Sequence, residues 1–396
     1  MLRFDRFALS LVFGLAFALP AFAQTPPPAS SQPEPEKKSL KDRLKEPDQG
    51  GGIHFTEHFA IVFGGIKQGS GIALGPALST KFKDGGFAQL KAVYSVKQFK
   101  LVQARYDTRR FWSDRAIVIS RARWQDAPEL PLYHFGPDSP DARVDYSEKK
   151  TEVSSRASLK VAPLVTVNLG FGAERYTTGG GLIDRDPNVL AALAALGLSP
   201  APPPGLGTKP TFGHAFMGVG VDSRAPSSDY SRRGAFAEAE LHAYNDWKGG
   251  QDSFRRVELT GQQLIPTFGE RGVIDLSARA WLSQSANPLG VPFYLMPTLG
   301  GGDLLKAYPS YRFRDRNALL LKSEYRWAVH KMVDIAGVYE AGKVAPKVNG
   351  LKLENMAHSF AIGLRGHTDK ASLFRADLAY GSEGLGFRIG FSSGGS

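Results

Sequence analysis

The densest group of charged and aromatic side chains lies between Leu304 and Trp327. This stretch reads LLKAYPSYRFRDRNALLLKSEYRW, and its first half places four cations among aromatic residues: Lys306, Arg312, Arg314 and Arg316. Such cations form charge-assisted hydrogen bonds with carboxylates. The second half alternates apolar and polar residues. The polar group therefore leads directly into a strand, and its role depends on which solvent that strand faces.

The sequence shows no other group of residues that points to catalysis or metal binding. It has no cysteine for a thiolate site and no H-E-x-x-H motif. His54 and His58 are four residues apart, which on a strand only places them on the same face. We therefore expect no enzyme activity, no metal and no cofactor. A Ser/His pair on a barrel wall, as in outer-membrane phospholipases, stays open as a minor alternative.

The N-terminus has the three parts of a secretory signal peptide. Arg3 and Arg6 precede an apolar stretch at 8–19, and Ala21-Phe22-Ala23 forms a cleavage site. We expect residues 1–23 to be this signal. Residues 24–50, rich in Pro, Ser and charge, are expected to be a disordered periplasmic linker. Residues 51–396 have a uniform composition and are predicted to form one domain.

The net charge of +11 does not indicate nucleic-acid binding, because Lys and Arg are spread along the whole chain without a recognition motif. After the first 25 residues no apolar run reaches 18, so no transmembrane helix is predicted.

The main pattern in residues 51–396 has a period of two. Leu319, Leu321, Tyr325 and Val329 fall on one face of a predicted strand, whereas Glu324 falls on the other. This alternation is typical of half-buried strands. A soluble sheet would bury the apolar face, and a transmembrane barrel would turn it to lipid. Strands of about 9–12 residues and the export signal favour the barrel, with an all-β, antiparallel fold.

We count about sixteen strands, an even number as expected for a bacterial single-chain barrel. If the N-terminus is periplasmic, the long connections 126–143, 178–211, 284–317 and 341–355 all lie on the outer side. The predicted strands are 58–66, 71–82, 86–97, 100–110, 115–125, 144–161, 164–177, 212–222, 234–244, 253–264, 272–283, 318–329, 331–340, 356–366, 372–380 and 385–393.

Several motifs resemble the outer-membrane assembly-factor and bacterial surface antigen superfamily. The run from Tyr311 to Asn317 and the strand end Glu324-Tyr325-Arg326 are similar to its R-F-R-D-R-N and E-Y-R elements. Val338 to Val344 resembles its F-V-D-A-G-x-V motif. Asp222-Ser223-Arg224 with Ser231-Arg232-Arg233-Gly234 resembles its D-x-R and R-x-G pattern. The superfamily contains assembly-machinery barrels and two-partner secretion translocators.

The resemblance implies that the loop between strands eleven and twelve folds into the lumen. Its motif would be Leu305, Lys306, Ala307 and Tyr308, followed by Arg312, Arg314, Asp315 and Arg316. The lumen-wall residues matching the family's are Glu324, Arg326 and Glu340. Lys306 replaces an Arg and loses its bidentate geometry, and Ala307 replaces a Gly that could adopt positive φ.

The resemblance also implies a function at the bacterial outer membrane. We expect a monomeric barrel in outer-membrane lipid that assists insertion or translocation of proteins or lipids, with unfolded outer-membrane proteins as clients. About 30 residues lie between Ala23 and the first strand, so a barrel-only form without polypeptide-transport-associated domains is expected. A passive or plugged pore for small, anionic solutes is the alternative. Glycines weaken a strand, so the closing strand is a candidate for a weakly sealed seam, although packing relief explains its glycines equally well. The candidate seam residues are Gly384, Gly386, Phe387, Gly390 and Phe391.

Overall fold

The computed structural model describes the part of the chain that carries the predicted strands. The described residues are 52–64, 66–182, 188–189, 191–192, 203–224, 230–269, 271–287, 290–302, 304–368 and 372–391. The predicted signal peptide and linker lie outside these residues. No helix among the described residues is long and apolar enough to cross a membrane.

The chain forms one antiparallel meander in which each strand pairs with the next strand of the sheet. A short strand, β1 (Gly52–His54), precedes sixteen strands that match the predicted ranges in number and order. These sixteen are β2 (Phe59–Phe63), β3 (Ala73–Lys81), β4 (Phe87–Ser95), β5 (Lys100–Asp107), β6 (Ala116–Leu132), β7 (Val144–Ala162), β8 (Val165–Gly180), β9 (Thr211–Asp222), β10 (Gly234–Asp246), β11 (Phe254–Thr267), β12 (Gly272–Gln284), β15 (Asn317–His330), β16 (Val333–Ala345), β17 (Ala357–His367), β18 (Ser372–Gly381) and β19 (Gly384–Phe391). The all-β prediction is confirmed.

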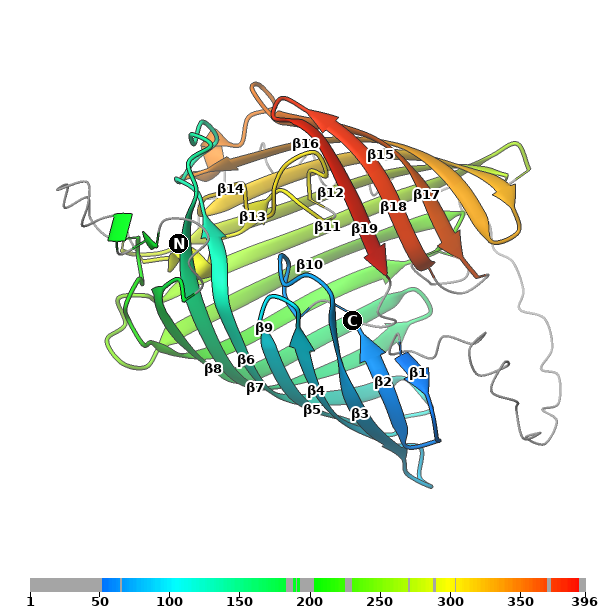
Figure 1. The fold of residues 1–396 in the computed structure, drawn as a ribbon. Coiled ribbons are helices and arrows are strands. Elements are labelled where there is room, and N and C mark those ends of the chain that lie inside the picture. Colours follow the sequence, from blue (N-terminus) through cyan, green and yellow to red (C-terminus); the bar gives the residue numbers. More distant parts are fainter. Residues whose placement is uncertain are drawn as a thin grey trace.

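The two edges of the sheet are β19 and the short β1 with β2, drawn in red and blue in Figure 1. Registers of paired residues run from β1 through β19. Among the described residues, no such register joins β19 to β1 or β2. Contacts other than this strand pairing therefore connect the two edges and keep the sheet curved.

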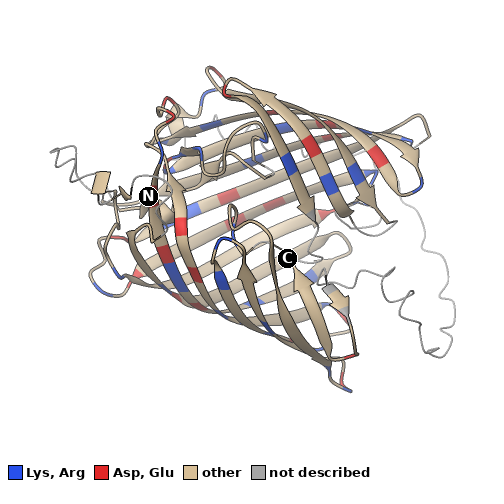
Figure 2. Ribbon diagram, viewed as in Figure 1, with Lys and Arg blue, Asp and Glu red and all other residues tan. Residues whose placement is uncertain are grey.

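The predicted alternation of apolar and polar residues corresponds to the two faces of the sheet. In β18, Leu378 and Tyr380 are exposed, whereas Asp377 and Ala379 between them are buried. Successive side chains of a strand point to opposite faces, so one face collects the apolar residues and the other the charges. Figure 2 shows acidic and basic segments interspersed along the strands.

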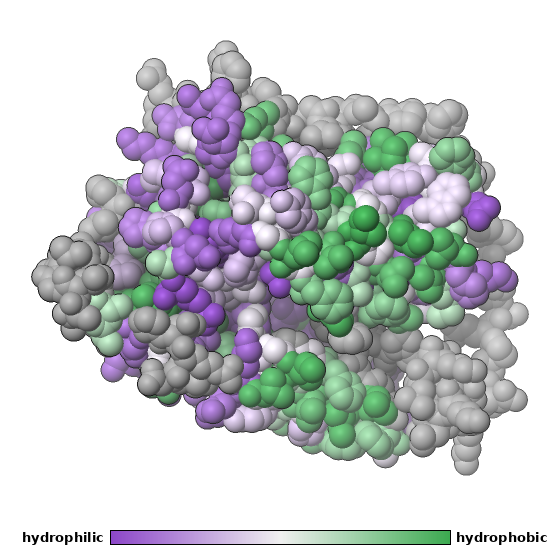
Figure 3. Space-filling view, turned by 45° about the horizontal axis from the view of Figure 1, so that its top comes forward, coloured by the Kyte–Doolittle hydropathy of each residue, from purple (hydrophilic) through white to green (hydrophobic). Residues whose placement is uncertain are grey.

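The apolar face forms a belt on the outside of the sheet. Leu385, Phe387 and Ile389 of β19 are exposed, as are Phe360, Ile362 and Leu364 of β17. Figure 3 shows apolar side chains gathered toward the right of the visible surface, with polar side chains toward its left end. An apolar outer band with charges inside is the arrangement of a transmembrane barrel.

One part of the outer wall departs from the prediction. Leu319, expected to face lipid, is buried because the connection between β16 and β17 folds over it. This connection includes the short 3₁₀ helix η2 (Val348–Gly350), and its Met356 packs with Leu319 and Leu282 in one apolar cluster. Tyr325 and Val329, farther along the same strand, are exposed as predicted.

The connections separate by length between the two ends of the sheet. The long connections 133–143, 181–210, 285–316 and 346–356 alternate with short ones and so share one end, which we call the loop end. The turns 82–86, 163–164 and 331–332 lie at the opposite turn end. One longer connection, 223–233, also lies at the turn end and was not among the predicted long ones.

Candidate functional site: the inward loop

The connection between β12 and β15 runs inside the curved sheet, as Figure 1 shows for its yellow segments β13 and β14. It contains the 3₁₀ helix η1 (Phe293–Leu295), and β13 (Thr298–Leu299) pairs with β14 (Phe313–Arg314). We call residues 285–316 the inward loop. Its tip, residues 305–308, is buried against the wall. The prediction of a loop inside the lumen agrees with this arrangement.

Lys306 at the tip is held by Glu340 of β16. Its Nζ donates to Glu340 Oε1 at 2.8 Å, and its backbone N–H donates to Glu340 Oε2 at 2.7 Å. Lys306 is 2 % exposed and Glu340 is fully buried. The backbone N–H thus supplies the second bond that a bidentate Arg would have made with its own side chain.

Glu324 and Arg326 were expected to contact the inward loop, but they bond to other segments. Glu324 lies 2.6 Å from Lys322 Nζ and accepts a hydrogen bond from Arg365 Nε at 3.0 Å. Arg326 donates to the carbonyl of Ser231, at the turn end of the lumen. The Lys306 pair therefore involves Glu340, and the residues of the E-Y-R element brace the wall and the turn-end connection instead.

Arg312 connects the loop to two further segments. Its Nε donates to Glu383 Oε1 at 2.6 Å, in the turn between β18 and β19. Its two terminal nitrogens donate to the hydroxyl and the carbonyl of Ser139, at 2.6 and 2.8 Å. The guanidinium also lies over the ring of Tyr133. All three nitrogens are used, so Arg312 fixes the loop against the β6–β7 connection and the β18–β19 turn.

Arg314 and its neighbours complete the predicted run. Arg314 is almost fully buried, donates to the carbonyl of Phe293 at 2.7 Å and lies against the rings of Tyr146 and Tyr311. Burial raises the pKa of Asp315, while the backbone N–H of Arg316 donates to its carboxylate and opposes that shift. Arg314 therefore connects β14 to η1 within the loop.

The tip packs against the closing strands at positions occupied by glycine. A Cβ at Gly381 would lie 2.8 Å from the Cβ of Ala307, and one at Gly386 would lie 3.2 Å from the carbonyl oxygens of Lys306 and Ala307. The positive φ of the tip occurs at Leu305, not at Ala307. Ala307 is thus accommodated by glycines in the wall.

These contacts change the interpretation of the closing-strand glycines. Gly386 permits close approach of the tip, and a Cβ at Gly390 would meet the side chain of Arg375. Gly384 has a φ of +103° next to the two-residue turn, a conformation that favours glycine. Packing and turn geometry account for them. Phe387 faces outward, and Phe391 ends β19.

The loop also contacts the opposite edge of the sheet. Gln68, in the connection between β2 and β3, donates from Nε2 to the carbonyl of Gly300 at 2.7 Å. Tyr311 donates from its hydroxyl to the carbonyl of Gln68 at 2.9 Å. At the other edge, Arg388 of β19 donates to the carbonyl of Tyr308 at 2.7 Å. The inward loop therefore bridges the first and the last strands of the sheet.

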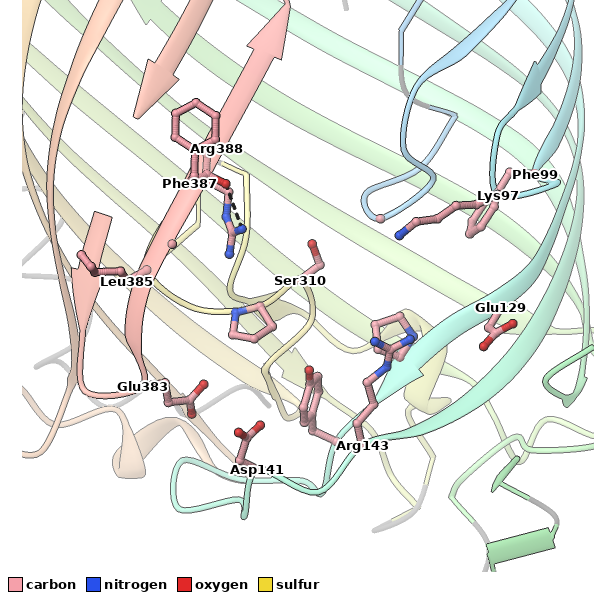
Figure 4. Close-up of a pocket in the computed structure, with 16 residues that line it drawn as sticks. Lys97, Phe99, Glu129, Asp141, Arg143, Ser310, Glu383, Leu385, Phe387 and Arg388 are labelled. Carbon is pink, nitrogen blue, oxygen red and sulfur yellow. Dashed lines mark hydrogen bonds between the residues drawn. The ribbon is translucent and has the colours of Figure 1, made fainter. Parts of the chain in front are cut away.

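A cavity of about 540 Å³ lies beside this bridge. Figure 4 shows it between β19, which contributes Phe387 and Arg388, and the connections that carry Lys97 and Arg143. Its lining combines acidic, basic and apolar side chains. Because Leu385 and Phe387 also belong to the lipid-facing belt, the cavity lies where the lumen approaches the edge of the sheet.

A second inward segment, outside the predicted site residues, lies at the turn end. Asp334 of β16 accepts hydrogen bonds from the hydroxyl of Tyr230 and, at 2.9 Å, from Arg232. His367 stacks on the Tyr230 ring. Burial, together with the bond to Asp334, raises the pKa of Tyr230. The only signal in the sequence was the resemblance of Ser231-Arg232-Arg233-Gly234 to the R-x-G pattern.

With its charged interior, apolar outer belt and antiparallel meander, this chain is an outer-membrane β-barrel protein. No protein-family model matches the sequence, and no curated protein matches it. Solved structures do match. One is BamA from Haemophilus ducreyi lacking POTRA domains 1–3, with a TM-score of 0.61 and 13 % identity over 85 % of this chain and 70 % of that chain.

A second match is CdiB from Escherichia coli, with a TM-score of 0.51 and 12 % identity over 85 % of this chain and 60 % of that chain. The barrel fold is therefore of the BamA and CdiB kind. At these identities the likeness shows the fold alone.

Proposed function

We propose that this barrel assists the insertion or translocation of proteins at the outer membrane, without enzymatic chemistry, and that the inward loop controls the edge of the sheet. The observation that carries the proposal is the bridge. The loop bonds to Gln68 beside β2 at one edge and to Arg388 of β19 at the other, and no register joins these two edges among the described residues.

The physical basis is the chemistry of strand edges. An unpaired edge offers backbone N–H and C=O groups that an incoming strand can use. A loop that holds both edges from inside would keep those groups unavailable, and its release would expose them. The buried pair of Lys306 and Glu340 anchors the tip of that loop.

The likeness to BamA and CdiB, together with the superfamily resemblance of the motifs, supports this assignment. The chain spans 70 % of the BamA chain and 60 % of the CdiB chain. We therefore propose, for this chain, the kind of activity that the superfamily's assembly and secretion barrels carry out. An unfolded outer-membrane protein is the proposed client.

Assisted folding in liposomes tests the proposal. The mature protein is reconstituted, an unfolded small barrel is added, and the rate at which that barrel becomes protease-resistant is measured. Empty liposomes provide the baseline. Lys306→Ala should change the acceleration, whereas Lys343→Ala should not, because Lys343 of the same strand as Glu340 donates to the carbonyl of Glu354 instead of to the inward loop.

The conductance of the same liposomes separates this function from the alternative of a plugged pore. If the protein accelerates no folding, but deletion of the inward loop opens a large ion conductance, the barrel is a pore and the proposal is wrong. Acceleration that depends on Lys306 and leaves conductance low would support the assembly function.

A further inference from the structure

Four basic side chains gather on the lumen wall near the first edge of the sheet, far from the inward loop in sequence. We call them the basic patch: Lys91 of β4, Arg105 of β5, and Arg121 and Arg123 of β6. Arg105 stands directly opposite Arg121 in the register of β5 and β6. Gln103 stands between Lys91 and Arg123 in the next row. The four cations therefore occupy neighbouring positions on three adjacent strands.

All four belong to the lumen face. Neighbouring residues in the three strands point outward and are exposed: Leu90 beside Lys91, Tyr106 beside Arg105 and Trp124 beside Arg123. Because side chains alternate between faces, the basic residues point inward. Arg123, Arg121 and Arg105 are also close enough to act electrostatically on Lys91.

The patch contains more positive charge than the nearby carboxylates neutralise. Asp107 pairs with Arg105 through two hydrogen bonds, at 2.7 and 2.8 Å. Glu152, which acts on Arg121 electrostatically, is bonded to Lys150 at 2.8 Å. Within the described ranges, no carboxylate forms an ion pair with Lys91, Arg121 or Arg123.

The donors of the patch are also incompletely used. Among the residues that the structure describes, Arg123 donates to two neutral acceptors, the carbonyl of Ile66 at 3.0 Å and the side chain of Gln125 at 2.7 Å. The Nε atoms of Arg121 and Arg123 are buried without a hydrogen-bond partner among the described residues. Buried donors normally have partners, so these two Nε–H groups can donate to an acceptor that enters the lumen.

The spacing indicates what kind of acceptor fits. Cross-strand neighbours lie about 5 Å apart, so the patch presents its donors over an area that one compact oxyanion can span. A carboxylate would neutralise one charge. A phosphate group carries more charge and has three acceptor oxygens, and guanidinium groups match its geometry.

We propose that the basic patch binds a phosphate group, either as a free anion or as the headgroup of a phosphorylated lipid. This site is separate from the inward loop and does not depend on the proposed assembly function.

The first test is thermal unfolding of the full mature protein, folded in a zwitterionic detergent, in phosphate and in chloride at equal ionic strength. Phosphate should raise the Tm, and K91Q/R121Q should bind phosphate at least about tenfold more weakly, because charged donors are lost. Arg156→Gln is the matched control, since Arg156 is also a lumen cation but is paired with Glu240 at 3.0 Å.

The same phosphate effect in K91Q/R121Q as in the unchanged protein would overturn the proposal, as would no effect of phosphate beyond that of chloride. Arg123→Gln provides a second, independent variant should the double variant fold poorly. Stabilisation by poly-glutamate but not by phosphate would also overturn it, in favour of an acidic polypeptide.

A second arm distinguishes the two sources of the phosphate. The protein is placed in nanodiscs that contain phosphatidic acid in phosphatidylcholine, and bound lipid is counted by native mass spectrometry. Phosphatidic acid retained by the unchanged protein and by Arg156→Gln, but lost in K91Q/R121Q, assigns a lipid headgroup. Equal retention in all three, together with the phosphate effect in detergent, assigns a free anion.

Discussion

The inward loop and the basic patch both place cations in the lumen, but the partners of these cations differ between the two regions. Lys306 and Arg312 of the loop each meet a carboxylate, and Arg312 also donates to the carbonyl of Ser139. Lys91 and Arg121 of the patch meet other cations. The same residue types thus hold the fold together in one region and leave charge available for a ligand in the other.

The difference shows that the partners of a lumen cation, rather than its presence, indicate its role. A buried cation with a full set of acceptors is costly to disturb, because removing one partner leaves the other buried and unpaired. A cation surrounded by like charges costs free energy in the unliganded protein, and its removal should relieve that cost. The two regions should therefore respond to mutation with opposite signs.

The largest effect is expected at the loop anchor. Glu340→Ala should lower the free energy of unfolding by about 3–5 kcal/mol, because it leaves Lys306 buried without its carboxylate. Urea-dependent unfolding of the mature protein in lipid vesicles measures this. The double variant K306M/E340A removes both charges and should recover a large part of the loss. A double variant as unstable as the single one would contradict a charge-based explanation.

A smaller loss is expected at the contact between the loop and the β18–β19 turn. Arg312→Gln removes the bonds to Glu383 and Ser139 and should cost about 1.5–3 kcal/mol, in the range of hydrogen bonds to charged groups. Limited proteolysis of the loop end should show faster cleavage. Lys97→Gln, an exposed change at the same cavity, should leave both stability and cleavage unchanged; equal effects of the two changes would argue against the contact.

The fit of the tip against the wall is tested by Gly381→Ala. The added Cβ would meet that of Ala307 at 2.8 Å, so the free energy of unfolding should fall by about 1–3 kcal/mol through overpacking. Combining it with Ala307→Gly should restore part of that stability, because the colliding atom is removed. If Ala307→Gly brings no recovery, the tip does not pack here as described.

The smallest effect is expected in the basic patch and has the opposite sign. Arg121→Gln should raise the free energy of unfolding by up to about 1 kcal/mol at low ionic strength, because like charges stand directly opposite each other. Added salt should reduce the gain, since it screens the repulsion. A loss of stability on this substitution would show that Arg121 is a structural residue like Arg312.

Much of the fold could be predicted because alternation is a local property of the chain. Leu378, Ala379 and Tyr380 reveal by their order alone which side chains share a face, and the turns between such runs fix the order of strands in a meander. Leu319 shows the limit of this approach. Its place in the pattern is correct, but a distant connection covers it, and no local pattern reports a contact of that kind.

The candidate site, like the fold, could be predicted only in part. The alternation in the sequence predicted the sixteen strands, and the resemblance of its motifs implied the inward loop and matched Lys306 and Glu340 to motif positions. The pairing of Glu324 with Lys322 and Arg365, and the bridge that the loop makes between the two edges of the sheet, became visible in the folded chain alone. The same holds for Arg105 and Arg121, which the register places directly opposite each other. The physical reason is that a charge's partner depends on strand register and on loops folded back from afar, and these bring together residues that the sequence separates.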